Sequence, residues 1–269
     1  NDTPGIFLAS AAKEYMKVYG VAVGKKPLIF TNNDSAYETA IEFKKNGIDP
    51  IVLDTREEQN SELINDAKNQ GIQIKFSHAV AVANGYKKVK SAKIGKLNSN
   101  KTGFENIEIV QCDCICVSGF WTPTVHLTSQ SGNKLKFNKD IDAFVPDKSK
   151  QKETTIGAAN GSFTLKETIE KSFESGADVG KKLTENQVNI QVPSVTEKKH
   201  KTHDKFWCSP LPKNENPKRF VDFQNDVSVA DIELALREGY RSIEHIKRYT
   251  TLGMATDQGR TSNLNGLQL

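Results

Sequence analysis

A strand, helix and strand pattern near the start of the chain most constrains its fold. Residues 26–31 ("KPLIFT") form a short apolar run, and residues 34–47 repeat apolar side chains at helical spacing before ending at Gly47. Residues 49–55 ("DPIVLDT") form a second apolar run. Two strands joined through a helix lie parallel in one sheet, so this pattern predicts a β-α-β unit.

The pattern continues and then changes character. Residues 61–71 ("SELINDAKNQG") predict a second helix, and residues 72–77 ("IQIKFS") predict a third strand. Runs separated by turn residues follow as "HAVAVANGY", "KKVKSAKIGKL" and "ENIEIV", which predict a three-stranded meander, and "CDCICVSG" predicts a closing strand. We therefore expect an α/β unit over residues 1–122.

Cysteines raise the question of metal binding. The i, i+2, i+4 spacing of Cys112, Cys114 and Cys116 predicts that all three lie on one face of a buried strand, as small apolar residues. Cys208 follows His200 and His203 at a spacing compatible with zinc. The charged sequence around them favours a plain linker, and both interpretations stay open.

Composition excludes several classes of protein. A net charge of +4 over 269 residues gives no dense basic face for nucleic acid. The longest apolar runs fall far short of the roughly 20 residues of a membrane helix, and no secretory signal precedes the first segment. We expect a cytoplasmic protein, and the absence of an initial methionine suggests a piece of a longer one.

The first unit resembles the nicotinamide-binding domain of glutathione-reductase-like flavoproteins. The turn "FTNNDSAYETA" is similar to the glycine-rich turn of that family, but its fingerprint positions are Thr31, Asn33 and Ala36. Side chains at the first two obstruct a tight turn and the approach of a pyrophosphate. Asp54 is placed to bind a ribose hydroxyl. The unit is therefore either a weak NAD site or a scaffold.

Residues 123–185 resemble the returning segment of the flavin-binding domain in the same family, with residues 1–28 as its connector. "KFNKDIDAFVPD" predicts two short strands, and the following "TTIGAANGSFTLKETIEKSFESGADVGKKL" predicts a strand, a tight turn and a long helix. Ala158 replaces the usual aspartate, which argues against ordinary FAD at this position. Gly157, Asn160 and Gly161 remain candidates for binding a dinucleotide, expected to be NAD.

A linker rich in Pro, Lys and Asn is predicted over residues 186–218, and a small domain over residues 219–269. Ser228 is the expected N-cap of the first of two helices. The segment resembles bacterioferritin-associated ferredoxins, whose cluster cysteines are replaced here by Asp222, Gln224, Asp257 and Ser262. Without thiolates, we expect no iron-sulfur cluster.

These features together, including "VDFQNDVSVADIELALREGYRSIEHIKRYTTLGM", resemble the alpha subunits of heterotetrameric sarcosine oxidases across the whole chain. The resemblance implies partner beta, gamma and delta subunits, and oxidation of sarcosine to glycine with release of hydrogen peroxide. It also implies FAD and a shared FMN, bound NAD, and one-carbon transfer to tetrahydrofolate by a domain absent from this sequence. Related opine and proline dehydrogenases generally keep the cluster cysteines.

We hypothesise that the loop without cysteines forms one wall of the FMN site, because its hydroxyls, amides and guanidinium suit a phosphate and a polar flavin edge. The candidate residues are Thr250, Thr251, Gln258, Gly259, Arg260, Thr261 and Ser262. Alternatives are a packing loop, a scaffold that only organises partners, and a pyridine-nucleotide reductase acting alone. No residue is assigned a catalytic role.

Overall fold

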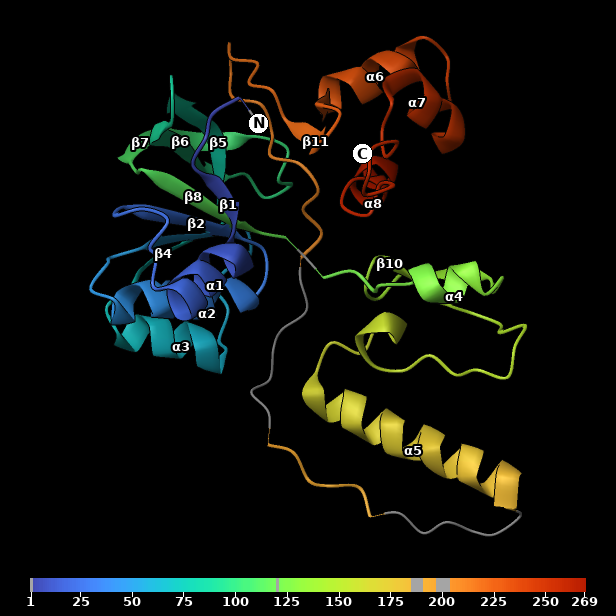
Figure 1. Cartoon of the computed structure of the whole chain (residues 1–269). Helices are drawn as coiled ribbons and strands as arrows, with labels where there is room; N and C mark the ends of the chain where they lie inside the picture. Colours follow the sequence, from blue (N-terminus) through green and yellow to red (C-terminus); the bar gives the residue numbers. More distant parts are fainter. Residues whose placement is uncertain (1, 120, 185–190, 197–203) are drawn as a thin grey trace. The chain divides into compact units, whose positions relative to one another are not determined.

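The structure is a computed structural model that describes residues 2–119, 121–184, 191–196 and 204–269 (Figure 1). The chain divides into two compact units. The first contains residues 1–119 and 204–269, and the second contains residues 120–203.

A parallel sheet forms the centre of the first unit, in the order β1-β8-β2-β3-β4. Its strands are β1 (Ile6–Leu8), β2 (Pro27–Thr31), β3 (Ile51–Asp54), β4 (Gln73–Phe76) and β8 (Cys114–Ser118). The crossover segments are α1 (Ala9–Tyr19), α2 (Ser35–Lys45) and α3 (Glu62–Asn69). The predicted β-α-β unit is confirmed, and β1 is an additional edge strand that the sequence pattern did not indicate.

The predicted meander is also confirmed. It consists of β5 (His78–Gly85), β6 (Val89–Leu97) and β7 (Phe104–Gln111), paired antiparallel in that order. In Figure 1 the helices lie against one face of the parallel sheet and the meander lies against the other, giving three layers.

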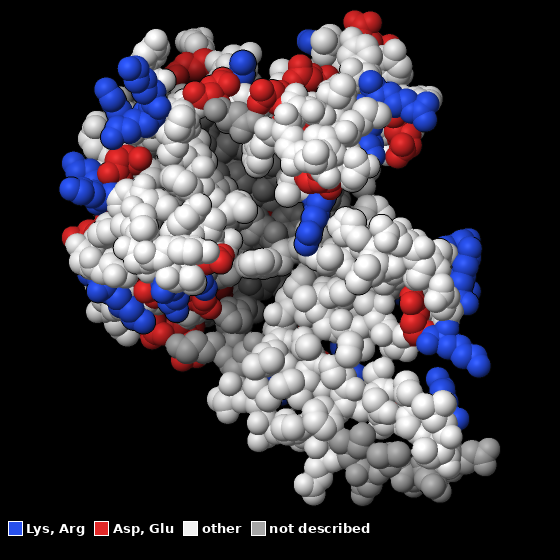
Figure 2. All heavy atoms as spheres, viewed as in Figure 1, with Lys and Arg blue, Asp and Glu red and all other residues white. Residues whose placement is uncertain are grey.

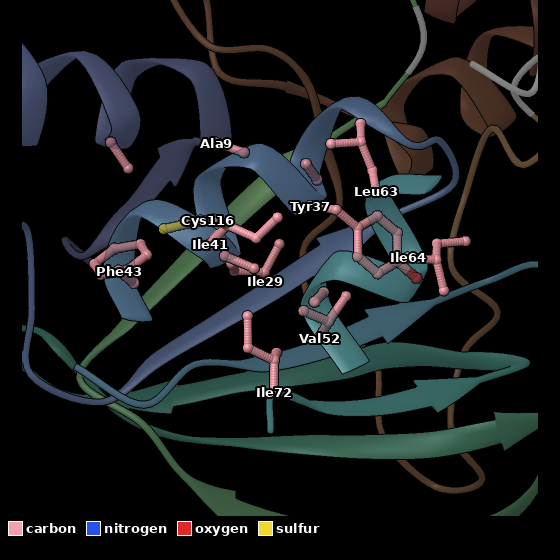
Figure 3. Packing of buried hydrophobic residues seen from close by; sticks show 14 of the residues in the cluster. Ala9, Ile29, Tyr37, Ile41, Phe43, Val52, Leu63, Ile64, Ile72 and Cys116 are labelled. Carbon is pink, nitrogen blue, oxygen red and sulfur yellow. The ribbon is translucent and has the colours of Figure 1, made fainter. Parts of the chain in front are cut away.

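Two apolar clusters hold these layers together. Ile29 and Val52 point toward the helices and pack with Tyr37 and Phe43 of α2, as Figure 3 shows. Leu28, one position away from Ile29, belongs to the second cluster, beneath the meander. Because the sheet is covered on both faces, its inner strands β2 and β3 are almost continuously apolar, whereas the edge strand β4 alternates. Each fully buried side chain of this size contributes about 1.5–3 kcal/mol.

The three cysteines at and just before β8 occupy two faces of the sheet, which corrects the prediction that they lie on one face. Cys114 and Cys116 lie in the cluster beneath the helices, whereas Cys112 lies in the cluster beneath the meander. β8 begins only at Cys114, because the Asp113 carboxylate accepts hydrogen bonds from the N–H groups of Lys25 and Lys26 and interrupts the alternation. The expected burial of all three is confirmed. Burial and then the Asp113 charge raise the pKa of the Cys112 thiol to about 11, so it stays protonated.

The second unit contains the predicted hairpin and long helix. Its elements are α4 (His126–Gln130), β9 (Leu135–Asn138), β10 (Ala143–Pro146), a short 3-10 helix (Gly157–Asn160) and α5 (Leu165–Thr184). Phe137 and Phe144 pack edge to face across the hairpin, with ring centroids 5.4 Å apart. The strand predicted at the start of "TTIGAANGSFTL" is wrong, because the backbone turns at Gly157 with a φ of 70° and enters the 3-10 helix.

The C-terminal part of the first unit is small and largely helical. It contains β11 (Phe220–Asp222), β12 (Val227–Ser228), α6 (Val229–Arg237), α7 (Ile243–Thr250) and α8 (Asn263–Gln268). Val221, Ile232, Ala235, Ile246 and Leu252 lie in one buried cluster. Ser228 is the N-cap of α6, as predicted, and its N–H and hydroxyl both donate to the Asp231 carboxylate. The last helix was not predicted.

Candidate functional site

The loop that follows α7 begins with a sharp turn. Thr250 ends the helix, and its hydroxyl donates to the Ile246 carbonyl at 2.7 Å. Thr251 takes the left-handed conformation with a φ of 63°. The Leu252 N–H donates a hydrogen bond to the Thr250 hydroxyl. This turn directs the chain back toward β11, and Leu252 enters the apolar cluster.

Asp222 is the centre of hydrogen bonding in this region. Its side chain is 2% exposed. One oxygen accepts from the N–H groups of Gln224 and Asn225, at 2.9 and 3.0 Å. The other accepts from the Gly253 N–H at 2.7 Å and the Ser262 hydroxyl at 3.2 Å. Burial alone would raise the pKa of the Asp222 carboxyl, but these donors outweigh it and hold the pKa below its ordinary value.

Asp257 organises the outer half of the loop. Its carboxylate accepts from the Gly259 N–H at 3.0 Å, and from the Thr261 hydroxyl and N–H at 2.8 and 3.3 Å. The Thr261 hydroxyl is the main reason that the pKa of Asp257 is lowered. The Gln224 side-chain oxygen accepts from the Asp257 N–H at 3.4 Å.

The positions predicted to have replaced cluster cysteines therefore contact one another. Asp222 bonds to Ser262, and Gln224 bonds to Asp257. The resemblance to ferredoxins singled out these four positions, but the sequence carried no signal that they would form hydrogen bonds in these two pairs.

The candidate FMN residues differ in how far they are exposed to solvent. Thr251, Gln258, Arg260 and Thr261 are exposed, and Thr250 is half-buried. Gly259 and Ser262 are buried, with Ser262 at 0% exposed. The Ser262 hydroxyl faces Asp222 and supports the loop from inside. The surface that the loop offers to a ligand thus comes from the exposed members of the set.

The degraded glycine-rich turn between β2 and α2 is closed by its own side chains. Thr31 and Asn33 are 2% and 5% exposed. The Asn33 side-chain oxygen accepts from the Ser35 N–H at 3.0 Å, at the start of α2. The Asn33 side-chain nitrogen donates to the Ser118 hydroxyl at 3.2 Å and to the Gly119 carbonyl. The amide therefore fills the space between β8 and the helix, where a pyrophosphate would approach the backbone.

Asp54 does not face an open ribose site, which corrects the expectation for this residue. It is 0% exposed, and both of its oxygens are engaged. Arg56 binds it through two side-chain nitrogens, at 2.9 and 2.7 Å, and the Tyr37 hydroxyl donates to it at 2.8 Å. Arg56 also lies 2.8 Å from the Asp34 carboxylate. The only sequence signal for this buried group was an arginine two positions after the strand-terminal Asp54.

The second unit holds a polar cavity next to the candidate NAD residues. It has a volume of about 410 Å³, and Asn160 lines it together with Thr128, Asn133, Lys136 and Thr155. Gly157 and Gly161 flank Asn160 with left-handed backbones, at φ values of 70° and 80°. Gly157 is buried, so it shapes the turn that presents Asn160.

The possible zinc site at His200, His203 and Cys208 lies partly outside the described residues, because both histidines fall there. Cys208 is half-buried, and Arg219 donates to its sulfur at 3.1 Å. Within the part of the chain that the structure describes, no group of three or more His, Cys, Asp or Glu side chains is arranged to hold a metal ion.

The surface of the described residues is mixed in charge. On the face shown in Figure 2, acidic and basic side chains are interspersed around the rim of the α/β layers. Among the described helices, none combines the length and apolar character needed to cross a membrane.

Comparison with known proteins gives matches over the entire chain. Residues 216–269 match the family model of the sarcosine oxidase A3 domain. The chain is 31% identical to sarcosine oxidase subunit alpha of Rhizobium meliloti (strain 1021), in a match that covers 100% of this chain and 26% of that protein. The chain is homologous to sarcosine oxidase alpha subunits. A second such subunit, from Corynebacterium sp. (strain P-1), is 30% identical, with 98% of this chain and 28% of that protein covered.

The chain thus spans about a quarter of the length of the sarcosine oxidase alpha subunits that it matches. Among solved structures, L-proline dehydrogenase from P. horikoshii aligns with a TM-score of 0.53 at 19% identity, covering 100% of this chain and 48% of that one. At this identity the alignment supports a shared α/β fold.

Proposed function

We propose that this chain is part of the alpha subunit of a sarcosine oxidase complex, an oxidoreductase acting on a CH–NH donor. The observation that carries the proposal is the similarity of the entire chain to proteins named sarcosine oxidase subunit alpha. The complex would demethylate sarcosine oxidatively to glycine, form hydrogen peroxide, and transfer the one-carbon unit to tetrahydrofolate. The partners would be beta, gamma and delta subunits in a cytoplasmic heterotetramer.

The parts of the chain would divide the work as follows. Residues 1–122 would be a nicotinamide-domain scaffold, and residues 123–185 the returning segment of an FAD-like domain, with NAD beside Gly157, Asn160 and Gly161. Residues 186–218 would be a linker, and residues 219–269 a domain of bacterioferritin-associated-ferredoxin type without a cluster. FAD and tetrahydrofolate would bind elsewhere in the complex.

The loop from Thr250 to Ser262 would supply one wall of the FMN site. Thr251, Gln258, Arg260 and Thr261 are exposed on one short segment, so the residues fit a phosphate and a polar ring edge. Arg260 would supply a planar cationic fork, and Asp257 would hold the shape of the loop through Gly259 and Thr261. FMN, when bound, would supply one-electron and two-electron redox chemistry that no side chain of this segment supplies.

The same geometry also supports a second candidate, a scaffold loop without flavin contact. Polar groups of the loop bond to other parts of the small domain: the Ser262 hydroxyl donates to Asp222 of β11, and the Thr250 hydroxyl donates to the Ile246 carbonyl of α7. In that case the loop would stabilise the small domain, and the subunit would only organise its partners. A further alternative is that the chain belongs to the alpha subunit of a related amine, opine or proline dehydrogenase, which would act on a different substrate.

An anaerobic titration of the assembled complex with sarcosine tests the proposed activity. We expect the visible flavin bands to bleach without any iron-sulfur absorbance. A complex that is bleached by proline or an opine, and not by sarcosine, would favour the related dehydrogenases. A complex that contains no flavin would contradict the proposed activity.

Flavin content tests the loop itself. Arg260→Ala and Thr261→Ala should lower the FMN occupancy of the assembled complex, while Arg241→Ala, an exposed arginine before α7, should leave it unchanged. Full FMN occupancy in both loop variants, with altered subunit assembly, would identify the scaffold role instead.

A further inference from the structure

The carboxyl ends of β2 and β8 form the place where an open α/β sheet normally binds a dinucleotide. Thr31 and Ser118 are paired neighbours at these two ends. The strand that follows β2 in the chain, β3, pairs with one edge of β2, whereas β8 pairs with its other edge, so the strand order reverses at β2. A strand-order reversal of this kind opens a crevice outside the strand ends, and ligands of such folds bind there.

In this protein a distant segment of the chain lies at that position. Asp204 donates its N–H to the Asn32 carbonyl at 3.2 Å, and the Asn32 side chain donates to the Asp204 carbonyl at 2.8 Å. Asn32 is the first residue after β2 and is 4% exposed. The two residues are 172 positions apart in the chain, so this contact is purely tertiary.

Charge holds the same segment in place. The Asp204 carboxylate forms an ion pair with the Lys101 ammonium, which projects from the turn between β6 and β7. The Asp204 side chain is 35% exposed, and the Lys101 side chain is 27% exposed. A lysine ammonium also binds phosphate groups, so the Asp204 carboxylate takes up a cation that an anionic ligand could otherwise bind.

Apolar and polar contacts extend the attachment along the segment. The Phe206 ring meets the Phe30 ring of β2 edge to face, with centroids 6.3 Å apart. The Ser209 hydroxyl donates to the Val80 carbonyl of β5 at 2.7 Å. Farther along, Glu215 bonds to Lys93 of β6 at 2.6 Å. In Figure 1 this is the orange stretch that leads to β11.

We propose that residues 204–209 are a strap that fills the dinucleotide crevice of the α/β unit as an internal ligand and closes it to nucleotides. The Asp204 carboxylate substitutes for the anionic group of a ligand, and the Phe206 ring covers the end of β2. Asn33 completes the closure by occupying the first N–H of α2. The unit thereby serves as a rigid support, and a dinucleotide carried by this chain must bind elsewhere. This inference does not depend on the identity of the amine substrate.

Peptide-resolved hydrogen exchange of the assembled complex tests the strap. Asn32→Ala and Phe206→Ala each remove one attachment, so exchange should accelerate together in peptides that cover 31–37 and 204–211. Loss of one hydrogen bond of about 1 kcal/mol corresponds to a roughly fivefold acceleration. Tyr86→Ala, at a meander turn where the side chain is 87% exposed, is the control and should change neither peptide.

Ligand addition supplies the second arm of the experiment. Millimolar NAD+ or NADP+ should leave exchange in peptides 31–37 and 204–211 of the wild-type complex unchanged. Protection of peptide 31–37 by either dinucleotide would overturn the proposal, because it would show an open crevice. Unchanged exchange in both strap variants would also overturn it, because the segment would then not be held at the strand ends.

Discussion

The Ser262 hydroxyl donates to the buried Asp222 carboxylate at 3.2 Å and so connects two residues 40 positions apart. Asp222 ends β11, and Ser262 precedes α8. The same carboxylate accepts from the Gly253 N–H, so one side chain ties together β11, the turn after α7 and the start of α8. This cross-link supplements the small apolar cluster that holds residues 219–269 together.

Replacing Asp222 should destabilise the small domain more than replacing its partner. Asp222→Ala leaves the N–H of the buried Gly253 without an acceptor and removes the acceptor of the N–H groups of the exposed Gln224 and Asn225, so it should cost about 2–4 kcal/mol. Ser262→Ala removes one donor and should cost about 1 kcal/mol. Native-state hydrogen exchange of residues 219–269 measures both free energies. Equal effects of the two variants would contradict a central role for Asp222.

Acid should loosen the same region. The pKa values of Asp222 and Asp257 lie below their ordinary value in the folded chain. Their contribution to stability is therefore complete above the unfolded pKa of about 3.9 and is lost as the pH falls below it toward the folded pKa. Hydrogen exchange between pH 6 and pH 3 should show this loss in residues 219–269. The Asp222→Asn variant should show a flatter pH profile, since its side chain does not titrate.

Gly253 should tolerate no side chain. Its φ is 67°, and an added Cβ would lie 2.0 Å from the Asn263 side-chain oxygen and 3.1 Å from the Gly259 backbone. Gly253→Ala should cost about 2–4 kcal/mol from backbone strain and overpacking together. Gly239→Ala is the matched control, because Gly239 also has a positive φ but has open space around it. Equal melting shifts in the two variants would show that strain alone matters. Adding Asn263→Ala should relieve part of the Gly253 effect.

The buried ion group of the α/β unit should depend strongly on Arg56. Its guanidinium is 4% exposed and lies between the Asp34 and Asp54 carboxylates. Arg56→Ala leaves both carboxylates buried without their cation and should cost about 3–5 kcal/mol. Tyr37→Phe removes one hydrogen bond to Asp54 and should cost about 1 kcal/mol. Urea denaturation measures both; a small effect of Arg56→Ala would mean that water reaches these carboxylates.

Local pattern accounts for much of the fold. The apolar runs of β2 and β3, the helical spacing of α2 and the turn signals of the meander are set by near neighbours in sequence, and all appear in the structure. Ser228 as a helix N-cap is equally local, because its partner Asp231 lies three positions away. Short elements such as β1 and α8 lacked enough residues to establish a period.

Contacts between distant residues were decided only by tertiary structure. The sequence by itself determined which side chains stand at the turn between β2 and α2 and at the positions predicted to have replaced cluster cysteines. Only the folded chain places Asn33 and the 204–209 segment over the crevice. It also pairs Arg56 with Asp54, and it brings the Ser262 hydroxyl to Asp222. The physical reason is that periodicity reports only neighbours along the chain, whereas each of these contacts depends on how separate elements pack.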